Sequence, residues 1–138
     1  MNESFDELQR LIHIAHDART RAIAPYSNFQ VGAALETVDG KIYSGCNIEN
    51  SSYGLTMCAE RVAIFKALSD GERNFKRLAI VAEAKELTPP CGACRQIIWE
   101  FCGDINVALA NENGDVTVLP MHELYPHAFD KSFLKQSQ

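Results

Sequence analysis

Three cysteines and one glutamate have the types and spacing of a catalytic zinc site. Cys58, Glu60 and Arg61 lie within four consecutive residues, and Cys91 and Cys94 form a Cys-x-x-Cys pair downstream. Three thiolates leave one position of a tetrahedral zinc ion open, as catalytic zinc requires, and a carboxylate nearby can serve as general acid and base. The pattern predicts one metal site built from both motifs.

Both cysteine motifs are expected at the starts of helices. Thr56 is a candidate N-cap for a helix over residues 57–69, and a proline pair before Cys91 precedes a second helical pattern. A helix N-terminus carries about half a positive charge and lowers the pKa of a thiol placed there. Two helices that present their N-termini to a common point would therefore hold the cysteines as thiolates near neutral pH.

Three thiolates and one Zn²⁺ carry one net negative charge, so we expect a cation to offset it. Arg61 lies on the helical face of Cys58 and is predicted to donate a hydrogen bond to a thiolate sulfur. Arg95 directly follows Cys94, and for this arginine an ordinary surface ion pair is an equally good interpretation.

Two other interpretations of the cysteines stay open at this stage. A structural zinc site needs a fourth thiolate, for which Cys46 and Cys102 are the candidates. Neither has a second ligand near it in the sequence, and we expect both to be small, buried apolar residues. Cys91-Gly-Ala-Cys94 at a helix start also fits a dithiol redox pair, which leaves the first motif unexplained. The metal content of the purified protein separates these cases.

The remaining patterns predict an α/β fold: a single three-layer domain of residues 1–138 whose mixed β-sheet of about five strands is covered by helices. Ser4 and Glu7 form a candidate capping box, and Asp39-Gly40 is a hairpin turn signal. An apolar run between two helical patterns indicates a parallel crossover strand. The expected elements are helices at 4–22, 57–69, from 91 and from about 122, and strands at 29–38, 41–48, 75–84, 105–110 and 116–121.

The composition is typical of a soluble globular protein, and it favours neither a nucleic-acid nor a membrane partner. The chain has 138 residues, 46% hydrophobic and 22% charged, with a formal net charge of −5 and no Lys/Arg run. Its first residues hold no long apolar block, so we expect no signal peptide, no transmembrane segment and a cytoplasmic location. His13 and His16 are spaced as a ligand pair but lack a third ligand, and we expect them on a solvated helix face.

A zinc site with a glutamate as proton shuttle is the pattern of deaminases. This chain resembles the cytidine deaminase family, in the short branch whose zinc is held by three cysteines, and the match spans nearly the whole chain. The resemblance implies that Cys58, Cys91 and Cys94 hold one Zn²⁺ per subunit and that Glu60 is catalytic, although helical periodicity alone would direct Glu60 away from Cys58. The stretches that carry it are PYSNFQVGAAL, GCNIENSSYGLTMC, CAERVAIF and PCGACRQ.

The resemblance also implies a substrate-binding set. Phe29 would pack against the pyrimidine, and the segment Asn47, Ile48 and Glu49 would bind the ribose. Residues two apart in an extended backbone point the same way, so Asn47 and Glu49 can together accept from and donate to one sugar hydroxyl. A polar turn that merely ends a strand is the alternative for this segment.

The implied function is zinc-dependent hydrolytic deamination of free cytidine, and of deoxycytidine, to uridine or deoxyuridine plus ammonia in pyrimidine salvage. The alternatives are deamination of a related nucleoside such as a nucleoside antibiotic, or of cytosine or adenine in nucleic acid, which needs a cationic groove. The family is commonly a homotetramer, which implies that Tyr53 and Phe129 lie near subunit-shared active sites. Simple packing is the alternative for both aromatic residues.

Overall fold

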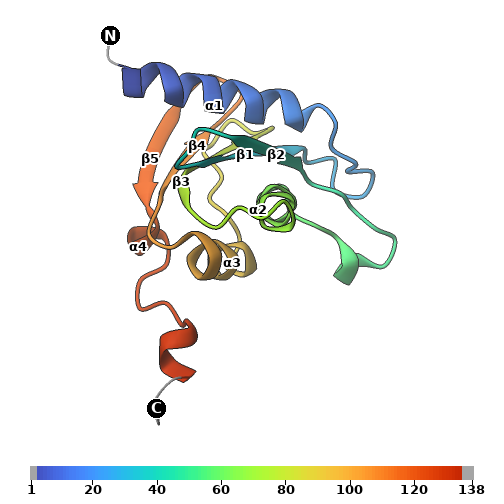
Figure 1. Cartoon of the computed structure of the whole chain (residues 1–138). Helices are drawn as coiled ribbons and strands as arrows, with labels where there is room; N and C mark the ends of the chain where they lie inside the picture. Colours follow the sequence, from blue (N-terminus) through green and yellow to red (C-terminus); the bar gives the residue numbers. More distant parts are fainter. Residues whose placement is uncertain (1–2, 135–138) are drawn as a thin grey trace.

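A five-stranded mixed β-sheet forms the centre of the protein in the computed structural model, which describes residues 3–134 (Figure 1). The strand order is β2-β1-β3-β4-β5. The elements are α1 (Glu3–Arg19), β1 (Val31–Thr37), β2 (Ile42–Cys46), η1 (Tyr53–Leu55), α2 (Ala59–Ser69), β3 (Phe75–Ala82), α3 (Gly92–Cys102), β4 (Asn106–Ala110), β5 (Val116–Pro120), α4 (Met121–Leu124) and η2 (Lys131–Leu134).

The sheet has one parallel pair, between β3 and β4, and its other neighbours are antiparallel. The connection between the parallel strands runs through α3, because parallel neighbours need a long crossover. The expected crossover strand and the hairpin between β1 and β2 are both confirmed.

No helix among residues 3–134 is long and apolar enough to span a membrane.

The helices form two outer layers, with α1 on one face of the sheet and α2 and α3 on the other (Figure 1). On β1, Ala33 and Leu35 pack with α2 and α3, whereas Ala34 between them packs with α1, as the period of two in a strand requires. The three-layer α/β prediction is therefore confirmed. On β3 the same alternation puts Leu78 and Ile80 on the α2 side and Ala79 and Val81 on the α1 side.

Two glycines let helices approach the sheet closely. A Cβ at Gly32 on β1 would lie 1.9 Å from the carbonyl oxygen of Ala15 in α1. A Cβ at Gly45 on β2 would lie 2.5 Å from the carbonyl oxygen of Ala59 and 2.6 Å from the backbone nitrogen of Ala63, both in α2. Since α2 follows directly after Cys58, Gly45 helps to set the position of the first cysteine motif.

The first helix differs from its expected bounds. Ser4 lies within the helix and therefore does not cap it, and the helix ends at Arg19 instead of Ala22. The chain leaves α1 through a turn in which backbone N–H groups of residues 20–22 donate to carbonyls three residues earlier. His13 and His16 are exposed on this helix, as expected.

The start of α2 is also corrected. Thr56 is not its N-cap, because the Thr56 hydroxyl oxygen accepts a hydrogen bond from the backbone of Asn50 at 3.2 Å. Cys58 is the N-cap, with an extended backbone at φ −77° and ψ 152° and no side-chain capping bond. Its thiol is thereby left for another use.

Candidate active site

The three cysteines of the two motifs come together where α2 and α3 begin. Cys58 and Cys91 are the N-cap residues of these helices, and Cys94 lies in the first turn of α3. Their three sulfur atoms lie within 4.8 Å of one another, and the Sγ atoms of Cys58 and Cys91 are 4.0 Å apart. Sulfurs about 2.3 Å from a tetrahedral zinc ion are separated by about 3.8 Å, so the donor set fits zinc.

A fourth thiolate does not join the cluster. Among the described residues, the group able to hold a metal ion consists of Cys58, Cys91 and Cys94, without Cys46 or Cys102. Burial raises the pKa of the Cys102 thiol to about 12, as for a small apolar core residue. One coordination position therefore stays open to a water or a substrate.

The electrostatics of the cluster favour a thiolate at Cys58. The pKa of this thiol falls to about 5, first because of its hydrogen bond with Cys94 and then because of Arg61, whose Nη2 lies 3.4 Å from the sulfur. The same hydrogen bond and burial raise the pKa of Cys94. Arg61 also donates to the Thr56 carbonyl at 3.4 Å. The predicted hydrogen bond from Arg61 to a cysteine sulfur is confirmed.

Glu60 lies beside the thiols and is 5% exposed. Burial raises the pKa of its carboxyl to about 7, with a further contribution from the charge of Cys58, and a hydrogen bond with Cys94 acts in the opposite direction. Helical periodicity wrongly predicted that the Glu60 side chain points away from Cys58, because Cys58 has an extended backbone and is not part of the helix. The structure thus brings Glu60 and the cysteine cluster together.

A cavity of about 260 Å³ opens beside the cluster. Its lining contains Cys58, Glu60 and Cys91 together with Phe29, Asn47 and Glu49, which come from distant parts of the chain. Most of the residues expected at the site therefore share one cavity. Several other lining residues carried no functional signal in the sequence, among them Ser27, Thr56, Met57, Thr88 and Pro89.

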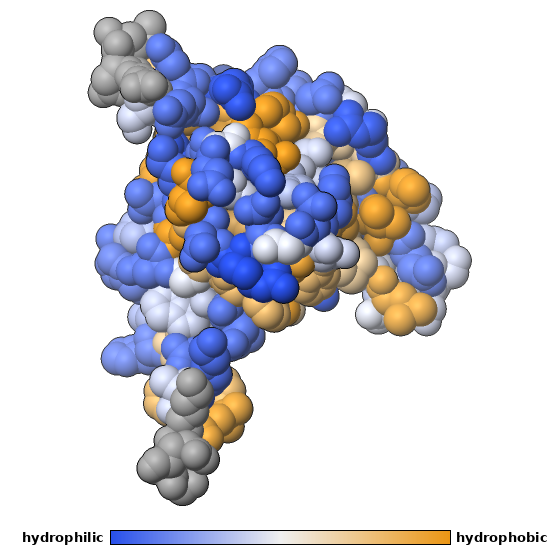
Figure 2. All heavy atoms as spheres, viewed as in Figure 1, coloured by the Kyte–Doolittle hydropathy of each residue, from blue (hydrophilic) through white to orange (hydrophobic). Residues whose placement is uncertain are grey.

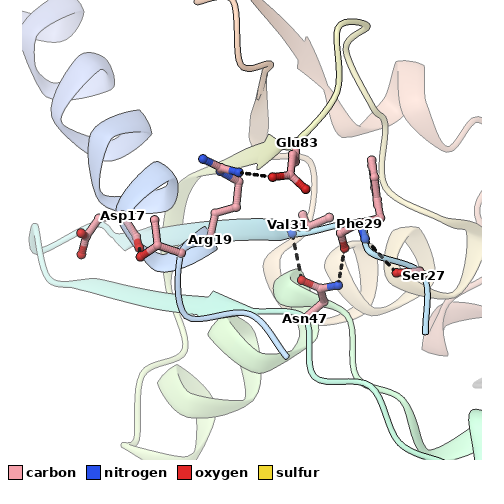
Figure 3. Close-up of polar contacts among 8 residues, drawn as sticks. Asp17, Arg19, Ser27, Phe29, Val31, Asn47 and Glu83 are labelled. Atoms are coloured by element: carbon pink, nitrogen blue, oxygen red, sulfur yellow. Dashed lines mark hydrogen bonds and ion pairs between the residues drawn. The ribbon is translucent and has the colours of Figure 1, made fainter. Parts of the chain in front are cut away.

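The side chain of Asn47 joins β2 to the segment that enters β1. Its Oδ1 accepts a hydrogen bond from the Val31 backbone at 2.8 Å, and its Nδ2 donates to the Phe29 carbonyl at 2.7 Å (Figure 3). The primary amide keeps a second N–H and a second lone pair. Asn47 thus fixes the backbone of Phe29 and can still bind a ligand.

The carboxylate of Glu49 holds the turn before Phe29. Its Oε1 accepts hydrogen bonds from the backbones of Tyr26 at 2.9 Å and Ser27 at 3.1 Å, and its Oε2 accepts one from the Ser27 hydroxyl. The Ser27 hydroxyl and these backbone donors lower the pKa of Glu49. The closure of this turn by a residue more than 20 positions away in the chain has no signal in the local sequence.

Ile48 contributes its backbone, not its side chain, to this region. Its N–H donates to the Met57 carbonyl and its carbonyl accepts from the Met57 N–H, both at 2.9 Å. This bridge ties the segment between Asn47 and Glu49 to the residue before Cys58. The Ile48 side chain is 40% exposed and does not line the cavity.

Arg95 forms no ion pair with a carboxylate of residues 3–134. Its Nε donates to the Pro90 carbonyl at 2.8 Å, and its Nη1 donates to the Leu124 carbonyl at the end of α4. Pro90 directly precedes Cys91, so Arg95 joins the second cysteine motif to the C-terminal part of the chain. Its position does not depend on a carboxylate partner.

Tyr53 and Phe129 do not line this cavity. Tyr53 is 74% exposed, and its ring meets Tyr26 edge-on with centroids 5.6 Å apart. Phe129 is 53% exposed and stacks on Phe133 at 5.6 Å. Neither aromatic residue belongs to the core of its own chain.

Comparison with known proteins agrees with this geometry. The model of the cytidine and deoxycytidylate deaminase zinc-binding region matches residues 6–109. A cytidine deaminase of Sporosarcina psychrophila is 53% identical over 129 residues, which cover 93% of this chain and 95% of that protein. The crystal structure of cytidine deaminase from Burkholderia pseudomallei aligns with a TM-score of 0.86 and 48% identity, covering 94% of this chain and all of that one. A blasticidin-S deaminase of Bacillus cereus is 32% identical over 110 residues, which cover 74% of this chain and 78% of that protein.

These similarities, with the open three-thiol cluster, define a hydrolytic deaminase with one bound zinc ion. Within that class, the chain belongs to the cytidine deaminase family. The family assignment, and the position of Cys46 and Cys102 outside the cluster formed by the described residues, argue against the structural-zinc and redox interpretations of the cysteines.

Proposed function

We propose that this protein deaminates free cytidine, and deoxycytidine, to uridine or deoxyuridine and ammonia, as a step of pyrimidine salvage. The observation that carries the proposal is the shared cavity, in which Glu60 and the cysteine cluster face Phe29, Asn47 and Glu49. The acid/base group and the groups suited to a nucleoside thus meet in one place.

We assign zinc binding to Cys58, Cys91 and Cys94. Zinc bound in such a site supplies a water molecule whose pKa is lowered to about 7. Arg61 supports the assignment, because its hydrogen bond to Cys58 offsets part of the thiolate charge. The expected metal content is one zinc per chain, and a content near two, or near zero after expression with ample zinc, would contradict the ligand set.

Glu60 acts as the proton shuttle. Its carboxylate takes a proton from the attacking water and delivers it to ring N3, which makes C4 electrophilic as the water oxygen bonds to it. The same group then takes the proton of the new C4 hydroxyl and gives it to the amino substituent, which leaves as ammonia while the C4 carbonyl forms. A buried carboxyl with a pKa of about 7 is suited to both directions of transfer.

Asn47 and Glu49 bind the ribose, and Phe29 packs against the pyrimidine. Both polar side chains hold the backbone around Phe29 and still have hydrogen-bonding capacity for one sugar hydroxyl. The backbone of Ile48 supports this segment through Met57. A site built for a hydroxyl loses about 1–3 kcal/mol for each polar group left unpaired by a ligand that lacks it, so free cytosine should be a poor substrate.

The sugar-binding role is tested by kcat/KM for cytidine and cytosine with the wild type and Glu49→Gln. Glutamine keeps an oxygen for the Tyr26 and Ser27 backbones, so the turn is preserved while the charge is lost. We expect the preference for cytidine to shrink in the variant. An unchanged ratio would mean that Glu49 does not bind the sugar.

Two rival substrates are separated by a panel of cytidine, deoxycytidine, blasticidin S and a cytidine-containing oligonucleotide. The net charge of −5 disfavours a polynucleotide, and the higher identity to cytidine deaminase favours cytidine over an antibiotic nucleoside. We expect ammonia release from the two free nucleosides alone. Faster release from blasticidin S or from the oligonucleotide would overturn the proposed substrate.

We further propose that residues 1–138 form one domain, that the protein is cytoplasmic, and that four copies assemble with Tyr53 and Phe129 near neighbouring active sites. The exposure of both rings, and their absence from the cavity of their own chain, support a role between subunits. Light scattering should give a mass about four times 15.3 kDa. A monomeric mass with full activity would contradict the shared site.

A further inference from the structure

The C-terminal segment, residues 125–134, extends away from the body beyond α3 and α4 (Figure 1). Hydrophobic side chains gather at its end (Figure 2). Phe129, Phe133 and Leu134 are 53%, 51% and 74% exposed. An extended segment with few neighbours needs specific contacts to hold one position.

Side chains of α3 provide such contacts along the segment. Arg95 donates to the Leu124 carbonyl, and the indole N–H of Trp99 donates to an Asp130 carboxylate oxygen at 3.0 Å. The chain is therefore attached to α3 on both sides of Phe129, at Leu124 and at Asp130.

Gln96 lies between these two anchors and makes two contacts of its own. Its Oε1 accepts a hydrogen bond from the Tyr125 hydroxyl at 2.5 Å, and its Nε2 donates to the Phe129 carbonyl at 2.9 Å. The side chain is partly buried. An amide side chain offers a donor and an acceptor together, which glutamate cannot do when ionised and leucine cannot do at all.

We propose that Gln96 is a positioning residue, whose amide fixes the Phe129 backbone and thereby the direction in which the Phe129 ring leaves the chain. The inference rests on the proposed role of Phe129 at a neighbouring active site. Since Gln96 follows Cys94 by two residues, α3 connects the metal cluster of one subunit to the aromatic group offered to another.

The position of the segment is tested directly by hydrogen exchange on the zinc-loaded full chain. Gln96→Leu keeps much of the side-chain volume but loses both bonds, Gln96→Glu keeps the acceptor for Tyr125, and Gln9→Leu is a control at an exposed position of α1. We expect the amide exchange rate at residues 125–134 to rise at least ~5-fold in Gln96→Leu and by less in Gln96→Glu. The exchange rate of the sheet should not change in either variant, and Gln9→Leu should exchange as the wild type does. Unchanged exchange at the segment in Gln96→Leu would overturn the positioning role.

The link to catalysis is tested by kinetics with and without Phe129. We expect Gln96→Leu to raise the KM for cytidine at least ~5-fold while kcat stays within about 2-fold and the zinc content stays at one per chain. In a Phe129→Ala background the same change should have no further effect on KM, since both changes act through one ring. Additive effects, or loss of zinc, would overturn the link. If Phe129→Ala alone leaves KM unchanged, the proposed role of Phe129 has failed. The exchange result still tests whether Gln96 positions the C-terminal segment.

Discussion

Replacing Gly45 by alanine should displace the helix that carries the first half of the site. Gly45 lies on β2 directly under α2, where a Cβ would come within 2.5 Å of the Ala59 carbonyl oxygen and 2.6 Å of the Ala63 nitrogen. These are backbone atoms, so no side-chain rotation relieves the overlap. The helix, with Cys58 before it and Glu60 in its first turn, or the edge strand β2 must shift instead.

The size of the displacement follows from the contact distances. An ordinary contact for a Cβ begins at 3.4 Å, so α2 and β2 must move apart by roughly 0.9 Å. Overpacking of this kind costs about 1–3 kcal/mol of stability, and a misplacement of about 1 Å in an active site can cost about 10²-fold in rate. We therefore expect Gly45→Ala to lose stability in that range and to lower kcat by about 10- to 100-fold.

Thermal unfolding and steady-state kinetics, measured on the same zinc-loaded preparation, separate the two effects. Gly54→Ala is the matched control, because no atom lies within 4 Å of a Cβ built there and its φ is not positive. The control should stay close to the wild type in unfolding temperature. If Gly45→Ala also shows wild-type stability and kcat, the close approach of β2 and α2 does not position Glu60.

Two further predictions concern the loops around the cavity. Asn111 is 5% exposed, donates to the Lys85 carbonyl and to Asp115, and accepts from two backbone N–H groups of its turn, so Asn111→Ala should lower the free energy of unfolding by about 1–3 kcal/mol in a denaturant titration. Wild-type stability would show that these bonds do not anchor the loop before Cys91. The pKa of Glu49 is lowered in the folded state from its ordinary value of 4.5, so its contribution is present above that value and is lost as the pH falls through the folded pKa. The stability difference between wild type and Glu49→Gln should therefore shrink on acidification, and a difference that grows would refute the assignment.

The cysteine cluster could be predicted from the sequence because its parts are local. Cys91 and Cys94 are spaced for one helical turn, and Cys58 precedes a clear helical pattern, so only the meeting of two helix starts required tertiary structure. The sheet could be predicted for the same reason, since turn signals and apolar runs mark each strand. The N-cap at Cys58 was missed because Thr56, the better capping residue by type, is engaged by Asn50.

The wall of the cavity opposite the cluster could not be derived from the residues alone. Glu49 closes the turn at Ser27, and Ile48 pairs with Met57, across chain separations that leave no periodic pattern. Arg95 shows the same limit. Its position beside Cys94 suggested a role in offsetting charge or an ion pair, whereas its hydrogen-bond partners are two backbone carbonyls. Resemblance to the family named Phe29, Asn47 and Glu49, and the structure adds what holds them in place.

The most direct test of the account is the activity of Glu60→Ala measured together with its zinc content. The carboxylate is buried beside the thiols but is not one of the three clustered metal-binding candidates, so its removal should leave one zinc per chain. We expect kcat/KM for cytidine to fall by at least ~10²-fold with the metal still bound. Near-normal turnover by the zinc-loaded variant would contradict the central claim that Glu60 moves the proton.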